Sequence, residues 1–168
     1  AGAHDLLLCS GGMSVGEEDH MATAVTAMGH LHFWKLAIKP GRPVALGQVG
    51  RTPFVGLPGN PVAVMVTFLR IARPLILRLS GTTDLDPTLY TVTADFEHRK
   101  KAERREWVRA TLARGADGTL LARKFPRQGA GVLSSMVAAD GLVELAEDLT
   151  HVTPGTQVAF LPFSEVID

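Results

Sequence analysis

Residues 5–16 carry the sequence DLLLCSGGMSVG, which indicates the class of fold. A strand is predicted for residues 5–9, because this apolar run is typical of a buried parallel strand, which needs neighbours on both sides. A glycine-rich loop follows, and then a helix is predicted for residues 19–28, with Met21, Val25 and Met28 on one face and Gly29 at its end. This order predicts an α/β domain. Because a central strand stands so near residue 1, we expect the chain to begin inside that domain.

Three short strands are predicted next, over residues 33–38, 44–49 and 54–57. Turn-forming pairs separate them, Pro40-Gly41 after the first and Gly50-Arg51 after the second. The alternation of apolar runs and turns extends the α/β pattern.

A long helix is predicted for residues 60–79, with Asn60 as N-cap and Pro61 at the first helical position. Its first half is apolar nearly all round, which predicts burial against a sheet or against a second subunit. Pro74 should kink the second half, because proline lacks the amide hydrogen that the helix uses.

Residues 82–88, TTDLDPT, lack apolar periodicity and predict a linker. Beyond them apolar residues recur at every second position, as in strands, and the Asp117-Gly118 pair predicts a hairpin. The chain is therefore expected to hold a partial α/β domain at residues 1–81, a linker at 82–88 and a small β-domain at 89–168.

Composition excludes several classes of function. The chain has 168 residues, 46% of them hydrophobic, and 17 basic residues balance 17 acidic ones, so no overall field favours nucleic acid or an anionic membrane. Its apolar run from residue 61 meets Arg70 before it could span a bilayer. A single cysteine, Cys9, allows no intrachain disulfide and fits the reducing cytoplasm.

The glycine-rich loop offers the first candidate ligand site. It follows a strand, where open α/β sheets bind ligands, and glycines let backbone amides approach an anion. Its candidate binding residues are Ser10, Gly11, Gly12 and Ser14. A tight connection with a glycine at positive φ explains the same pattern. Asp19, at the helix start, is either a cap or a ligand that holds Mg²⁺ against a phosphate.

Two lysines and a second loop extend the candidate site. Lys35 and Lys39 lie four residues apart and, in one strand, would share a face beside Arg42, which suits an anionic ligand; a solvated strand face is the alternative. The second loop, Pro58-Gly59-Asn60, stands before the long helix, where Asn60 either contacts a ligand or caps the helix.

Three segments together resemble a known family. SGGMSVGEEDH at residues 10–20, FWKLAIKPGRPVALG at 33–47 and GLPGNPVAVMVTF at 56–68 are similar to the C-terminal half of the MoaB/Mog-like domain in the MoeA molybdenum insertases, which include the gephyrin E domain. Residues 89–168 resemble the family's small C-terminal domain more weakly. The resemblance implies half of a three-layer α/β domain followed by a small β-barrel-like domain.

The implied activity is insertion of molybdate into adenylated molybdopterin with Mg²⁺-dependent release of AMP. By resemblance, Asp19 stands near the metal and phosphates, Lys35 and Lys39 hold molybdate and pterin phosphate, and Arg109 points toward the molybdate. A homodimer and a Mog/MoaB-type adenylyltransferase partner are also implied. The alternative is a gephyrin-like scaffold that binds a peptide, although such a module need not keep anion ligands.

This sequence departs from the family pattern at two hydroxyl positions. Ala63 and Ala130 stand where the family often has serine, and Ser134 and Ser135 are the nearby hydroxyls able to compensate for Ala130. The family's N-terminal regions are also missing from these 168 residues, so we expect the chain alone to be inactive.

Overall fold

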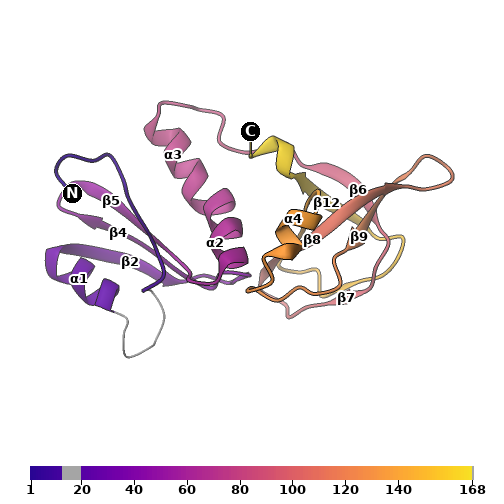
Figure 1. The fold of residues 1–168 in the computed structure, drawn as a ribbon, viewed down its shortest axis with the longest axis horizontal. Helices are drawn as coiled ribbons and strands as arrows, with labels where there is room; N and C mark the ends of the chain where they lie inside the picture. Colours follow the sequence, from indigo (N-terminus) through magenta and orange to yellow (C-terminus); the bar gives the residue numbers. More distant parts are fainter. Residues whose placement is uncertain (13–19, 168) are drawn as a thin grey trace. The chain divides into compact units, whose positions relative to one another are not determined.

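The computed structural model describes residues 1–12 and 20–167, except for the side chains of Phe33 and Trp34. Its contacts divide the chain into two units (Figure 1). The first unit contains Ala1–Leu36 and Pro40–Leu85, and the second contains Ala37–Lys39 and Asp86–Asp168. A three-residue piece of the first half of the chain therefore packs with the second half.

The first unit contains a mixed four-stranded sheet in the order β1-β5-β4-β2. β1 (Leu7–Ser10) runs parallel to β5 (Thr52–Leu57), while β4 (Pro43–Val49) is antiparallel to both β5 and β2 (Gly29–Lys35). Within the described residues β1 pairs with β5 alone, and Leu8 is 45% exposed. The expected neighbours on both sides of this strand are thus not found in the described part of the chain.

Helices cover both faces of this sheet because the strand side chains alternate. Ala45 of β4 and Phe54 of β5 pack with α1 (His20–Met28) through Ala22 and Val25. The next residue of each strand, Leu46 and Val55, points to the opposite face and packs with the long helical segment that follows β5. The expected three-layer α/β architecture is confirmed.

That helical segment is α2 (Pro61–Thr67), a π-helical turn over Phe68–Ala72 and α3 (Arg73–Leu79). In a regular α-helix the ring of Pro74 would clash with the carbonyl of Arg70. The wider turn ends just before this proline and relieves that clash. The irregularity expected at Pro74 therefore takes the form of a π-helical turn.

The second unit contains a closed five-stranded barrel in the order β10-β12-β6-β9-β8, which the pairing of β8 with β10 closes. Its core includes Val92, Val108, Val143 and Phe160. The strands are β6 (Tyr90–Ala94), β8 (Arg105–Arg114), β9 (Leu120–Lys124), β10 (Gly141–Leu145) and β12 (Gln157–Pro162). The expected β-barrel-like domain is confirmed.

Shorter elements complete the second unit. A two-stranded pair joins β7 (His98–Arg99) to β11 (His151–Val152), α4 (Ser134–Ala138) precedes β10, and a 3-10 turn covers Phe163–Glu165. The predicted Asp117-Gly118 hairpin joins β8 to β9, with Gly118 at φ 86° and the Thr119 amide donating to Asp117 Oδ1 at 3.0 Å.

The remaining strand, β3 (Ile38–Lys39), pairs in parallel with Arg105 and Glu106 at the start of β8. The strand predicted over residues 33–38 is interrupted, because β2 ends at Lys35 and the Leu36 amide donates to the Arg42 carbonyl at 2.9 Å. Lys35 and Lys39 therefore belong to different strands, and the expectation that they share one strand face was wrong.

Candidate functional site

The two loops expected to bind a ligand lie together in the first unit. They follow the parallel strands β1 and β5, and the Gly11 amide donates to the carbonyls of Leu57 and Pro58 at 3.1 and 3.3 Å. Gly11 and Gly12 have φ of 77° and 67°, which favours glycine at both positions. The loops thus meet at the carboxyl end of the sheet, but the Gly11 amide is already engaged and is not the free phosphate donor that the pattern suggests.

The turn at Pro40 to Pro43 packs against the same end of the unit. Gly41 has φ 98°, and a Cβ there would collide with Thr67 Cγ2 of α2 and lie 3.6 Å from Pro58 Cγ. The turn leaves the Arg42 side chain exposed. Lys35, also exposed, stands opposite Pro43 in the pairing of β2 with β4. Two cations and two loops therefore share this part of the first unit.

Asn60 occupies the N-cap position of α2 with an extended backbone at φ −72° and ψ 128°. Its side chain makes no capping hydrogen bond within the described residues, and the residue is exposed together with Gly59. Its amide is thus open to a ligand, whereas Pro58 is buried.

Two expected residues, Ser14 and Asp19, lie outside the described residues. Among the residues that are described, no group of three or more histidine, cysteine or acidic side chains is arranged to hold a metal ion. A Mg²⁺ site would therefore depend on Asp19.

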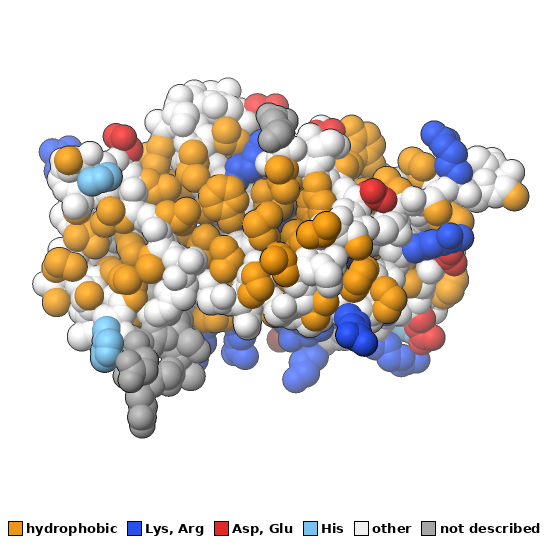
Figure 2. All heavy atoms as spheres, in the orientation of Figure 1, with side chains coloured by type: hydrophobic (Ala, Val, Ile, Leu, Met, Phe, Trp, Pro, Cys, Tyr) orange, Lys and Arg blue, Asp and Glu red, His pale blue; other side chains and the backbone are white. Residues whose placement is uncertain are grey.

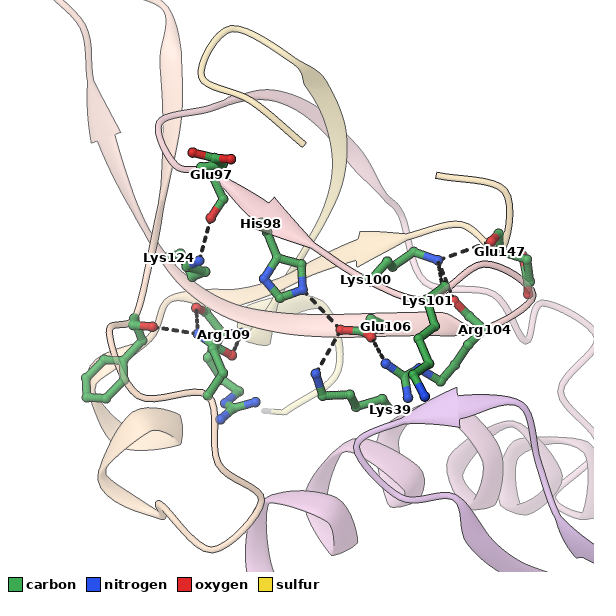
Figure 3. Close-up of polar contacts among 12 residues, drawn as sticks. Lys39, Glu97, His98, Lys100, Lys101, Arg104, Glu106, Arg109, Lys124 and Glu147 are labelled. Carbon is green, nitrogen blue, oxygen red and sulfur yellow. Dashed lines mark hydrogen bonds and ion pairs between the residues drawn. The ribbon is translucent and has the colours of Figure 1, made fainter. Parts of the chain in front are cut away.

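Lys39 belongs to a charged cluster in the second unit. Its Nζ lies 3.2 Å from Glu106 Oε2, and the Nε2 of His98 lies 3.1 Å from the same oxygen. Arg104 forms an ion pair with the other carboxylate oxygen, Oε1. Figure 3 shows the three side chains converging on Glu106. Glu106 is 2% exposed, whereas the Lys39 side chain is 45% exposed, so a buried carboxylate holds an accessible ammonium.

The electrostatics of Glu106 follow from these partners. Burial alone would raise the pKa of this carboxyl, but the hydrogen bonds from His98 and Arg104 and the charge of Lys39 outweigh burial and leave the pKa below its ordinary value. Glu106 is therefore an anion at neutral pH. The side chains around it belong to a basic region: Figure 2 shows Lys and Arg side chains gathered on the edge of the second unit where β7 lies.

Arg109 lies in the barrel wall and is only 1% exposed. Its Nε donates to Ser135 Oγ at 3.0 Å and its Nη2 to the Gly129 carbonyl at 3.0 Å, and within the described residues no acidic side chain pairs with it. Burial lowers the pKa of this guanidinium below its ordinary value. Arg109 thus supplies a buried positive charge that a ligand does not reach directly in this conformation.

The loop that contains Ala130 wraps around Arg109. Gln128 takes the place of a strand partner: its Oε1 accepts from the Arg109 amide at 3.1 Å and its Nε2 donates to the Arg109 carbonyl at 2.9 Å. The Ser135 hydroxyl accepts from Arg109 and donates to the Val132 carbonyl at 2.6 Å, so it supports Arg109, whereas Ser134 is exposed. Ser134 is the one of these two serines whose side chain is accessible.

Sequence reasoning missed Glu106, His98 and Arg104. A signal was present in HRKKAERRE at residues 98–106, where five Lys and Arg residues surround a short turn before a buried strand. A single acid at the start of an apolar strand next to such a run indicates a buried carboxylate with cationic partners.

Two family models match the chain in order. The "probable molybdopterin binding domain" model matches residues 1–78, and the "MoeA C-terminal region (domain IV)" model matches residues 91–163. The two matches cover the α/β unit and the barrel unit. The chain belongs to the MoeA family.

Individual relatives agree with this assignment. A molybdopterin molybdenumtransferase of Haemophilus influenzae is 33% identical over 97% of this chain and 41% of its own length. The Drosophila melanogaster molybdenum cofactor synthesis protein cinnamon is 32% identical over 84% of this chain and 24% of its own length. The crystal structure of a molybdopterin biosynthesis moea protein from Pyrococcus horikosii superposes with a TM-score of 0.76 at 26% identity, over 96% of this chain and 38% of that one. This chain thus spans about two fifths of the length of the first of these relatives.

In the described part of the chain, no helix is both long and apolar enough to cross a membrane.

Proposed function

We propose that the protein containing this chain inserts molybdate into adenylated molybdopterin and releases AMP. The observation that carries the proposal is the Lys39 ammonium, nearly half exposed and held on a buried carboxylate, at a position where the family motif has lysine. The relatives named as molybdopterin molybdenumtransferases, which match both units, support the same reaction class.

The chemistry requires positive charge at defined points. Molybdate is a dianion and the adenylated pterin carries phosphates, so cations that contact these groups stabilise the charge that develops as the anhydride bond breaks. Lys35, Lys39 and Arg42 have exposed or partly exposed side chains and are proposed to contact the anions. Arg109 is proposed to act as a fixed charge beneath the Gly129 loop, since its guanidinium is buried.

The loops of the first unit are proposed to place the pterin substrate. Ser10, Gly12, Gly59 and Asn60 are exposed at the carboxyl end of parallel strands, where α/β sheets bind ligands. Asn60 is the strongest candidate for a direct hydrogen bond, because its amide is exposed and does not cap the helix.

Mg²⁺ remains part of the proposal through Asp19, which lies outside the described residues, as does the proposed substrate-binding residue Ser14. When bound, Mg²⁺ would supply positive charge next to the phosphate oxygens. The proposed cations and loop residues need only bind and orient the anions for their part in the reaction.

The proposal extends to the assembly and the cellular location of the protein. We expect a homodimer and a Mog/MoaB-type adenylyltransferase that supplies the adenylated substrate, in the cytoplasm. The apolar helix was one reason for expecting a dimer, because it was predicted to pack against a sheet or a second subunit. Its residues Val62, Val66 and Leu69 are buried within the first unit, so they do not need a second subunit to cover them. Sedimentation of the purified protein measures the dimer directly, and a monomer contradicts it.

The experiment that tests the function supplies the purified full-length protein that contains this chain with adenylated molybdopterin, and measures AMP with and without molybdate. Molybdate-dependent AMP release supports the proposal. AMP release that does not depend on molybdate contradicts it. Tight binding of a peptide by a protein that releases no AMP supports the scaffold alternative.

A further inference from the structure

The cluster around Glu106 has more side-chain partners than one carboxylate needs. Oε1 pairs with Arg104, while Oε2 has both His98 and Lys39 within 3.2 Å. The exposed fractions of the partners differ: 12% for His98, 28% for Arg104 and 45% for Lys39. Lys39 is thus the most accessible of the three, and a flexible lysine stem lets its ammonium turn without moving the backbone.

Backbone pairing fixes the position from which the Lys39 side chain extends. Lys39 stands directly opposite Glu106 in the parallel pairing of β3 with β8, and the Arg105 amide donates to the Ala37 carbonyl at 3.0 Å. β3 is only two residues long, so few backbone hydrogen bonds hold it. The ion pair is the side-chain contact that ties Lys39 to the barrel wall.

The other partners of Glu106 determine whether its carboxylate stays compensated when Lys39 turns toward an anion. A buried carboxylate that loses its only cation is strongly destabilised. Glu106 would still have Arg104 on one oxygen and His98 on the other, so it does not need Lys39 for compensation. Figure 3 shows Lys39 and His98 approaching the same oxygen from different elements.

We infer that Glu106 is a positioning residue that holds the Lys39 ammonium ready for the oxyanion substrate, while Arg104 and His98 keep the carboxylate satisfied when Lys39 turns to that anion. The inference rests on the proposed function and adds a residue that acts through Lys39. It differs from a simple field effect, because removing a negative charge near an anion site should strengthen anion binding, whereas loss of positioning should weaken it.

The test compares Glu106→Gln with Glu147→Gln in the purified protein. Glu147 lies in the same unit, pairs with Arg105 and is half exposed, and the two substitutions remove the same charge. We expect Glu106→Gln to raise the molybdate concentration for half-maximal AMP release by about tenfold, a coupling in the middle of the usual range. Glu147→Gln should leave it unchanged or lower it slightly.

A double variant separates positioning from a structural effect. In a Lys39→Ala background, Glu106→Gln should change the affinity for molybdate, measured by equilibrium dialysis, by less than about twofold, since a residue that acts through Lys39 has nothing left to position. A tenfold further loss in that background overturns the inference. If wild type shows no molybdate dependence, the proposed function fails; if wild type and Lys39→Ala differ but Glu106→Gln matches Glu147→Gln, the inference alone fails.

A second readout needs no activity. Acetylation of Lys39 by a water-soluble amine reagent, measured by peptide mass spectrometry on ligand-free protein, should become several-fold faster in Glu106→Gln and unchanged in Glu147→Gln, because an ion-paired amine is a poor nucleophile. Equal rates overturn the pairing. If Glu106→Gln does not fold, Glu106→Asp serves instead, because it keeps the charge but withdraws the carboxylate by one carbon. A smaller rise is then expected in both the rate of Lys39 acetylation and the half-maximal molybdate concentration. No rise in either quantity overturns the inference.

Discussion

Lys39 Nζ lies 3.2 Å from Glu106 Oε2, and these two residues stand opposite each other where β3 pairs with β8. The contact joins a residue from the middle of the α/β half of the sequence to the barrel that follows it, within one structural unit. The barrel thus determines the position of a lysine side chain that is expected to bind substrate.

The barrel should lose stability when Glu106 is removed. Glu106→Ala leaves Arg104, His98 and Lys39 without their shared anion, and we expect a loss of about 2 kcal/mol in the free energy of unfolding, below the full cost of breaking a buried pair because the partners are partly exposed. Urea unfolding followed by Trp107 fluorescence in a Trp34→Phe background reports on the barrel alone. Glu147→Ala, at an exposed ion pair, should cost less than about 1 kcal/mol; equal losses would refute a special role for Glu106.

Barrel stability should also depend on acid through the same residue. The pKa of Glu106 is lower in the folded chain than its ordinary value, so its contribution is fully present above the unfolded pKa and is lost as pH falls through the folded one. Glu106→Gln should therefore flatten the decline of stability below about pH 4.5. Thermal unfolding between pH 3 and 7 measures this, and a variant with the wild-type acid profile contradicts it.

Ser135 should matter for stability where Ser134 does not. Ser135 is buried and its hydroxyl accepts from Arg109 Nε, so Ser135→Ala leaves a buried charged donor without its acceptor, at a cost of about 1–3 kcal/mol. Ser134→Ala changes an exposed side chain and should cost less than about 0.5 kcal/mol. Chemical unfolding of both variants decides, and similar losses would show that Ser135 does not support Arg109.

Gly41 should tolerate alanine poorly, because two separate effects act there. Its φ is 98°, and an added Cβ would also collide with Thr67 of α2. Gly50→Ala is the control, since Gly50 has φ 60° but nothing within 4 Å of an added Cβ. The control should cost about 1 kcal/mol and Gly41→Ala clearly more. If calorimetry finds the two equal, the turn does not pack against α2 as described.

The family resemblance implied the barrel-like form of the second domain. The sequence alone was sufficient to predict the α/β order and a small β-domain, because both depend on local periodicity and glycine placement. It was insufficient for Lys39. The spacing of Lys35 and Lys39 fits one strand, but the Leu36 amide donates to the Arg42 carbonyl and interrupts that strand. Nothing in the sequence of residues 35–39 predicts this interruption.

Pairings across long sequence separations were equally hidden. Glu106 and Lys39 are 67 residues apart, and Arg109 reads as an exposed strand position until Gln128 and Ser135 are seen to enclose it. The period-two pattern places Arg109 on the strand face opposite Val108 and Ala110, but only the structure shows that Gly129 and Ser135 cover this outer face.

The most direct test of the account is AMP release from adenylated molybdopterin by Lys39→Ala, measured against molybdate concentration. Lys101→Ala is the control, because it removes the same charge from an exposed position in the same unit. We expect Lys39→Ala to lose molybdate-dependent release while its unfolding matches wild type, and Lys101→Ala to keep it. Normal molybdate-dependent release by folded Lys39→Ala would contradict the account.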